Sequence, residues 1–140
     1  DVSIKAGIIA LLKDLVRRKS LSLLYITHDL ATVGHICDTI AIMYLGKIVE
    51  IGPADTVLDH PLHPYTRALI SAIPIPDPDT HREEIPIAGA IPDPIHLPPG
   101  CRFAPRCPRA GTGCRQEEPG LIPSAADPEH RVACIRTVDR

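Results

Sequence analysis

The chain is poor in several kinds of residue, and each shortage excludes a class of protein. Aromatic residues make up 3% of its 140 residues and tryptophan is absent, so aliphatic side chains must form most of any core. No apolar run reaches the roughly 20 residues that a membrane-crossing helix needs. The formal net charge is -2, which gives no general attraction to nucleic acid. The composition therefore favours an ordinary globular chain.

A phosphate-binding loop is also absent from the sequence. The pattern Gly-x-x-x-x-Gly-Lys-Ser/Thr occurs nowhere. Gly46-Lys47 is only a superficial match, because Ala41 stands where the first glycine would be and Ile48 where the hydroxyl residue would be. Alone, the chain is therefore expected neither to bind ATP tightly nor to hydrolyse it.

The first half of the chain has the pattern of an α/β protein. Apolar residues recurring on one face predict a helix over residues 3–19. The apolar run over residues 21–27 has the length of a buried strand, and a short helix is expected over residues 30–36. Two further runs, residues 39–44 and 47–51, predict a β-hairpin. This order of elements predicts a sheet buried on both faces.

His28 follows the predicted strand directly. Ligands of such sheets bind at the carboxyl ends of strands, so a titratable side chain here is placed to touch a bound anion. Position alone, however, favours the simpler interpretation that the histidine caps the next helix.

The composition changes near residue 60. Only one of the 16 prolines, Pro53, comes earlier, so the second half cannot form long helices. The exception is residues 63–73, where Pro64 suits a first helical position and His63 is expected to be structural. An extended segment with short strands over residues 84–88 should follow. We therefore expect one domain over residues 1–60 and a proline- and cysteine-rich appendage over residues 61–140.

Four of the five cysteines lie late in the chain, at Cys101, Cys107, Cys114 and Cys134. Without a secretion signal, a metal or cluster site is a better hypothesis than a disulfide framework. The spacing C-x5-C-x6-C-x19-C matches neither a zinc-ribbon pair nor a ferredoxin run, so an iron–sulfur cluster, zinc, disulfides and free thiols all stay open. Nearby cations would offset thiolate charge: Arg102, Arg106, Arg109, Arg115 and Arg131. Cys37 is expected to be a small buried hydrophobe.

Three segments of the first half resemble the end of an ABC-transporter ATPase domain: residues 1–3, 24–30 and 42–50. The resemblance identifies Asp1 with the D-loop aspartate, which lies at the ATPase dimer interface. It identifies His28 with the switch histidine of the H-loop, which hydrogen-bonds the γ-phosphate and helps to hold the attacking water. A small donor at this place suits phosphoryl transfer, which depends on positioning and charge stabilisation.

Two later segments, residues 61–69 and 100–108, are similar to hallmarks of the oligopeptide/dipeptide branch of these ATPases. Members of this branch carry a [4Fe–4S] cluster on cysteines in the same pattern. The resemblance therefore implies a cluster, with zinc as the alternative, at four ligands: Cys101, Cys107, Cys114 and Cys134.

The resemblance implies a fold and a function. The fold would be the C-terminal, α/β part of a P-loop NTPase domain from the D-loop onward, followed by the appendage. The intact subunit would be an ATPase that uses ATP and Mg²⁺ to power import of peptides or related small solutes. Its partners would be a second ATPase subunit, transmembrane permeases and, indirectly, a solute-binding protein. Its place would be the cytoplasmic face of the cell membrane, as a peripheral protein.

Two other hypotheses stay open. In one, residues 61–140 are a non-catalytic module that binds an iron–sulfur cluster or zinc. In the other, they form a docking or dimerisation appendage whose cysteines only staple the fold.

Overall fold

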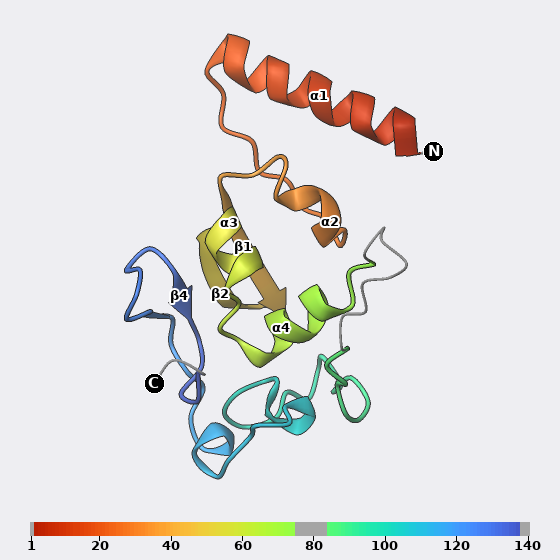
Figure 1. Cartoon of the computed structure of the whole chain (residues 1–140). Coiled ribbons are helices and arrows are strands. Elements are labelled where there is room, and N and C mark those ends of the chain that lie inside the picture. The colour runs from red at the N-terminus through yellow and green to blue at the C-terminus, as the bar shows by residue number, and fades with distance from the viewer. Residues whose placement is uncertain (1, 75–83, 138–140) are drawn as a thin grey trace. The chain divides into compact units, whose positions relative to one another are not determined.

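The computed structural model of the chain describes residues 2–74 and 84–137 (Figure 1). The side chains of Val2 and Ser3 are outside this description. The chain divides into two compact units, Asp1–Asp38 and Thr39–Arg140, and each is described by itself. The expected division into a domain over residues 1–60 and an appendage over residues 61–140 stays a prediction.

The first unit is helical. The helix predicted over residues 3–19 is confirmed as α1 (Val2–Lys19), which ends with Arg17, Arg18 and Lys19, where the helix dipole favours cations. The short helix α2 (Leu30–Val33) begins after Asp29, whose carboxylate accepts a hydrogen bond from the Ala31 N–H at 3.1 Å. The same carboxylate pairs with Lys5 of α1. These polar contacts join the two helices of the unit.

The strand predicted over residues 21–27 is wrong. This segment forms neither helix nor strand, and Leu24 and Ile26 are 85% and 88% exposed. A buried strand of the parallel type needs neighbours on both edges and helices on both faces. None of the described strands pairs with this segment, so its apolar side chains have nothing to pack against.

The second unit begins with the predicted hairpin, which is confirmed as β1 (Thr39–Tyr44) and β2 (Lys47–Pro53). Burial alternates along β1, as expected for a strand with one face on a core. The two turn residues, Leu45 and Gly46, have φ values of 45° and 77°. Positive φ at both positions is typical of the tight turn that matches strand twist, and it explains the glycine.

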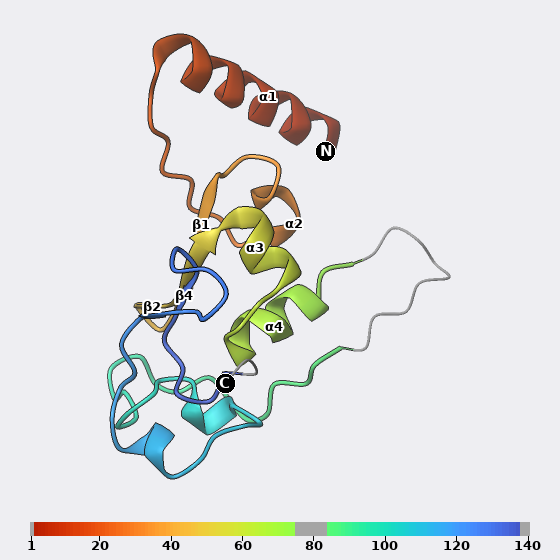
Figure 2. The ribbon, with the colours of Figure 1, turned by 60° about the vertical axis from the view of Figure 1, so that its left-hand side comes forward.

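Two helices follow the hairpin (Figure 2). α3 (Ala54–Asp59) was not expected from the sequence. α4 (Pro64–Ser71) confirms the helix predicted over residues 63–73, with proline at its first position. The short strands predicted over residues 84–88 are wrong, because those residues have no ladder partner and form no strand.

The C-terminal third of the chain joins the hairpin in one sheet. Two short strands, β3 (Ile122–Pro123) and β4 (Arg131–Val132), complete a sheet of order β1-β2-β4-β3. Between them and α4 lie two single 3₁₀ turns, η1 (Ala104–Arg106) and η2 (Gly113–Arg115). Large buried apolar side chains of this unit come from both sides of residue 60, among them Tyr44, Val49, Val57, Phe103 and Val132. The cysteine-rich residues are therefore packed onto the hairpin.

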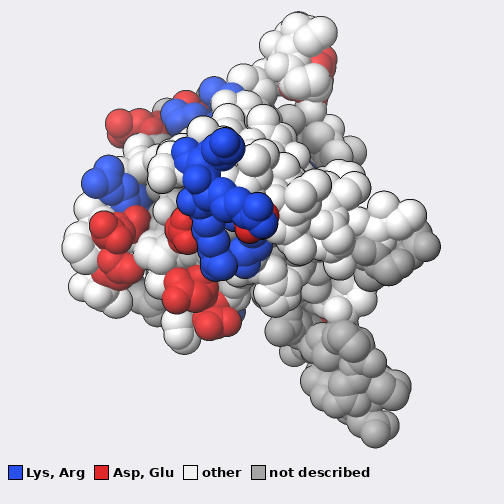
Figure 3. All heavy atoms as spheres, turned by 90° about the horizontal axis from the view of Figure 1, so that it is seen from above, with Lys and Arg blue, Asp and Glu red and all other residues white. Residues whose placement is uncertain are grey.

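Side chains of both charge signs are exposed. Figure 3 shows Lys and Arg side chains and Asp and Glu side chains at the surface. Exposed ion pairs such as Arg18–Asp14, at 2.8 Å, each contribute at most about 1 kcal/mol to stability. Within the described residues, no helix has the length and apolar character that crossing a membrane requires.

Candidate functional site

The four late cysteines line one cavity. Cys101, Cys107, Cys114 and Cys134 all contribute to the wall of a space of about 20 Å³, which has room for an occupant the size of a water molecule. Cys114 is buried and the other three are half-buried. Although 33 positions separate the first from the last, the fold brings together the four residues that the sequence singled out. We refer to this space as the four-cysteine cavity.

A close approach of the backbone creates one side of the cavity. The Cys101 N–H donates to the Cys114 carbonyl at 2.8 Å. Gly100 permits this approach, because its φ is +73° and a Cβ added there would lie 2.6 Å from the Cys114 carbonyl oxygen. Cys107 ends η1 and Cys114 lies within η2, so two single turns aim these thiols at the same space.

Burial determines the protonation of the thiols. It is the main cause that raises the pKa values of Cys101, Cys107 and Cys134, and the charge of neighbouring thiolates raises them further. Arg109 and Arg136 partly oppose this effect by lowering the pKa of Cys107. Without a bound cation the thiol form is favoured, whereas a metal centre would favour the thiolates.

Two arginines reach the cavity, and only one of them was expected. Arg109 and Arg136 both line it. Arg136 was not among the arginines named from the sequence, although it lies two positions after Cys134. Gly111 provides space for its guanidinium, where a Cβ would collide.

Arg102, in contrast, does not serve the cysteines as predicted. Its Nε donates to Glu118 Oε1 at 2.8 Å and its Nη1 donates to the Leu45 carbonyl. Lys47 pairs with the other oxygen of Glu118 at 2.8 Å. The contacts with Lys47 and Arg102 lower the pKa of Glu118. Arg102 therefore ties the cysteine-rich segment to the hairpin turn.

The four cysteines are residues of a type that binds metal ions, but the structure does not arrange them as a metal site. Among the described residues, no group of three or more His, Cys, Asp or Glu side chains is arranged to hold a metal ion. A zinc ion requires its sulfur ligands at about 2.3 Å from one point, and the structure does not support such a site. All five cysteines are free thiols, so the structure does not support a disulfide framework either.

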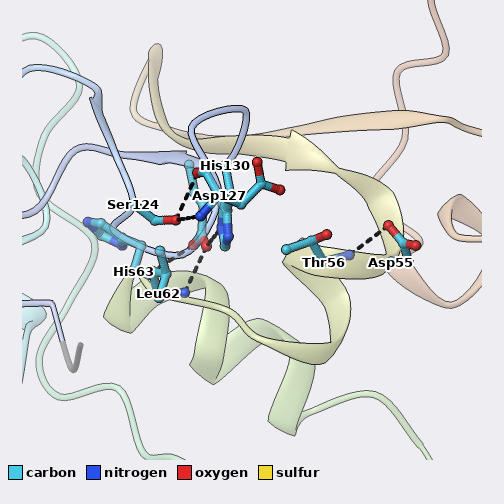
Figure 4. Close-up of polar contacts among 8 residues, drawn as sticks. Asp55, Thr56, Leu62, His63, Ser124, Asp127 and His130 are labelled. Atoms are coloured by element: carbon cyan, nitrogen blue, oxygen red, sulfur yellow. Dashed lines mark hydrogen bonds and ion pairs between the residues drawn. The ribbon is translucent and has the colours of Figure 1, made fainter.

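A buried polar cluster lies beside the cavity (Figure 4). Glu50 on β2 is 0% exposed. One of its oxygens, Oε1, accepts from the Leu62 N–H at 2.7 Å and lies 2.7 Å from His130 Nε2, and Oε2 accepts from the His63 N–H at 2.9 Å. Three separate stretches of chain therefore meet at one carboxylate, which the sequence analysis did not foresee.

His63 connects this cluster with the cavity. It is the N-cap of α4, with its Nδ1 accepting from the Tyr65 N–H at 3.1 Å, which confirms its predicted structural role. It is 1% exposed, and burial lowers its pKa to about 4. The residue also lines the four-cysteine cavity.

The predicted nucleotide-site residues lie in the first unit. His28 is exposed and directly precedes Asp29, the N-cap of α2, in an irregular segment instead of at the end of a strand. Asp1 lies outside the described residues. Cys37 is half-buried, and burial raises its pKa, in agreement with a packing role.

Comparison with known proteins shows what the chain is similar to. Residues 49–114 match the family described as "Oligopeptide/dipeptide transporter, C-terminal region". The chain is 50% identical over 135 residues to the "Probable peptide ABC transporter ATP-binding protein y4tS" of Sinorhizobium fredii, a match that covers 96% of the chain and 37% of that protein. It is 49% identical over 138 residues to the oligopeptide transport ATP-binding protein OppF of Salmonella typhimurium, covering 97% of the chain and 40% of that protein.

The chain therefore spans about two fifths of the length of these curated relatives. The match over residues 49–114 and these identities confirm the resemblance that the motifs indicated, to the ATP-binding subunits of oligopeptide/dipeptide ABC transporters.

Proposed function

We propose that this chain is part of the ATP-hydrolysing subunit that powers import of peptides, or of related small solutes, through an ABC transporter. The observation that carries the proposal is the roughly 50% identity to peptide-transport ATP-binding proteins over 96–97% of the chain. The whole subunit would pair with a second ATPase subunit and drive transmembrane permeases from the cytoplasmic face of the membrane. A solute-binding protein would deliver the cargo to the permeases.

In this proposal His28 contacts the γ-phosphate of ATP bound with Mg²⁺, and Asp1 lies at the interface between the two ATPase subunits. The exposed position of His28 beside a helix start leaves its imidazole available to a nucleotide. A positioned donor stabilises the charge that develops during phosphoryl transfer. The chain itself has no phosphate-binding loop, so these 140 residues alone should be inactive.

The test is His28→Ala in the whole subunit. Loss of the donor should reduce ATP turnover by about 100-fold and abolish transport, while ATP binding is retained. His35→Ala is the matched control, because His35 is an exposed histidine of the same unit and should leave turnover unchanged. Normal turnover in the His28 variant would contradict its assignment.

We propose a second function for residues 61–140: an appendage that binds a [4Fe–4S] cluster of structural or regulatory role. The convergence of Cys101, Cys107, Cys114 and Cys134 on one cavity supports it, and so do the two arginines that can offset the thiolate charge. Zinc is the alternative occupant.

Metal analysis after anaerobic purification tests the cluster. Iron and sulfide, with a brown colour, should be present and should be lost in Cys101→Ser and Cys107→Ser. Cys37→Ser, a change of the same kind at a cysteine outside the cavity, should retain them. One equivalent of zinc without iron would decide for the alternative. A melting temperature that falls with reductant but not with chelators would favour an appendage stapled by disulfides.

A further inference from the structure

The loop that carries His28 is fixed on both sides by hydrogen bonds. Thr27 Oγ1 accepts from the Asp29 N–H at 3.0 Å, so the two neighbours of His28 are joined across it. The Asp29 carboxylate accepts from the Ala31 N–H at 3.1 Å, and the Thr32 hydroxyl donates to the Asp29 carbonyl at 3.1 Å. Local bonds between side chains and backbone of this kind specify how the chain enters a helix. The backbone of His28 therefore has a defined conformation, although its side chain is exposed.

Asp29 also receives a contact from outside this loop. Its carboxylate pairs with the ammonium group of Lys5, which lies 24 positions earlier, near the start of α1. The hydrogen bond from Lys5 is the main cause that lowers the pKa of the Asp29 carboxyl, and the charge of His28 lowers it further. A second lysine of α1, Lys13, donates to the His35 carbonyl at 2.6 Å, just beyond the other end of α2. α1 is thus joined to the His28 segment at both ends of α2.

The helix cap alone does not explain the Lys5–Asp29 pair. An asparagine or serine oxygen caps a helix as well as an aspartate oxygen does, and neither needs a lysine. The two side chains are 45% and 30% exposed, and ion pairs at the surface contribute little to stability. The place of the pair is informative, because it directly follows His28 at one end and comes four positions after Asp1 at the other.

We propose that Asp29 and Lys5 are positioning residues for His28, and that their pair links the placement of the histidine to the start of α1. The inference rests on the proposed function, in which His28 contacts the γ-phosphate and Asp1 lies at the interface between the two ATPase subunits. A shift of the α1 start, when the subunits close on ATP, is carried to the His28 segment through this direct contact. A small misplacement of a donor slows a reaction strongly, so engagement of the partner subunit and placement of the donor become coupled.

Two substitutions remove the ion pair and keep the helices. Asp29→Asn retains a side-chain oxygen for the Ala31 N–H and loses the negative charge. Lys5→Met retains a good helix former of similar length and loses the donor. Arg18→Met and Asp14→Asn are the matched controls, because Arg18 and Asp14 form another ion pair of α1, at 2.8 Å.

The first measurement is ATP turnover by the whole subunit in its transporter. Each pair variant should lower kcat by about fivefold and leave the KM for ATP unchanged, because the donor is misplaced while the nucleotide still binds. The double variant should lose no more than either single variant, since each residue acts through the other. The control variants should match the wild type. An unchanged kcat in both single variants, or losses that multiply in the double variant, would overturn the inference.

The second measurement needs no nucleotide, so it distinguishes the failure of this inference from the failure of the proposed function. In the whole subunit with ¹⁵N-labelled histidine, His28→Ala identifies the His28 signals by their loss. These signals should shift in Lys5→Met, whose changed side chain is far from His28 in the sequence, and not in Arg18→Met. If His28→Ala turns over ATP normally, the proposed role of His28 fails and this shift still decides whether Lys5 positions it. His28 signals that Lys5→Met leaves in place would contradict the positioning role.

Discussion

Glu50 shows how one side chain can determine the arrangement of a whole unit. Its hydrogen-bond partners lie 12, 13 and 80 positions away along the chain. A carboxylate with no exposure to water has exchanged its hydration for these donors, so removing it leaves several N–H groups buried without an acceptor. The sequence contains no signal for this role, because a glutamate within a hairpin strand is expected to be exposed.

We predict that Glu50→Gln lowers the free energy of unfolding by about 3 kcal/mol. The glutamine amide keeps one acceptor oxygen but places an NH₂ group opposite an N–H donor. Urea unfolding followed by circular dichroism measures the effect. Glu117→Gln, the same change at an exposed position, should alter stability by less than about 0.5 kcal/mol, and equal losses in the two variants would contradict the buried role.

Helices and strands that depend on residues close together in the sequence could be predicted. Those that depend on pairing with a distant segment could not. The helix α1, the hairpin and α4 could be predicted, because amphipathic spacing, a turn glycine and a proline at the first helical position act within a few residues. The segment over residues 21–27 has strand composition but no strand beside it. β3 and β4, in contrast, are two residues each, too short to show any periodicity. β4 forms because β2 offers it an edge, and β3 pairs with β4.

The cavity, too, depends on a contact between residues distant in the sequence, and this contact involves Gly100. The sequence singled out the four cysteines that share the cavity but could not show how they converge. Convergence depends on the close contact between residues 100–101 and Cys114. His63 joined the cavity without any signal in the cysteine pattern, since only the folded chain brings it there.

We predict that Gly100→Ala destabilises the second unit by about 2 kcal/mol and reduces metal binding. A side chain there faces both a positive φ and the Cys114 carbonyl, and such positions are strained for residues other than glycine. Thermal melting and iron content measure the two effects. Gly120→Ala is the control, because a Cβ there meets nothing within 4 Å; a Gly100 variant that behaves like it would refute the requirement for close approach.

At the scale of the molecule, stability should depend on pH through His63. Its pKa is lowered from 6.5 to about 4 in the folded chain, so below pH 6.5 the unfolded state binds the proton more readily. The stability present above pH 6.5 is therefore lost as pH falls towards 4, by about 3 kcal/mol in total.

Urea unfolding at several pH values between 4 and 7.5 measures this loss. His63→Asn should show a shallower decline, because the variant lacks the buried imidazole. Parallel pH profiles for the wild type and the variant would show that His63 is not the group responsible.

The pairing of β2 with β4 has a consequence for synthesis of the protein. Glu50 faces Val132 across the ladder, and the Ala133 N–H donates to the Val49 carbonyl at 2.8 Å. The ribosome synthesises residue 50 some 80 residues before its partners. The edge of β2 therefore stays unpaired while the segment that contains the cysteines is synthesised. Sheet closure and gathering of the thiols thus become one late event, and any cofactor that assembles there must be inserted into a chain whose hairpin is already folded.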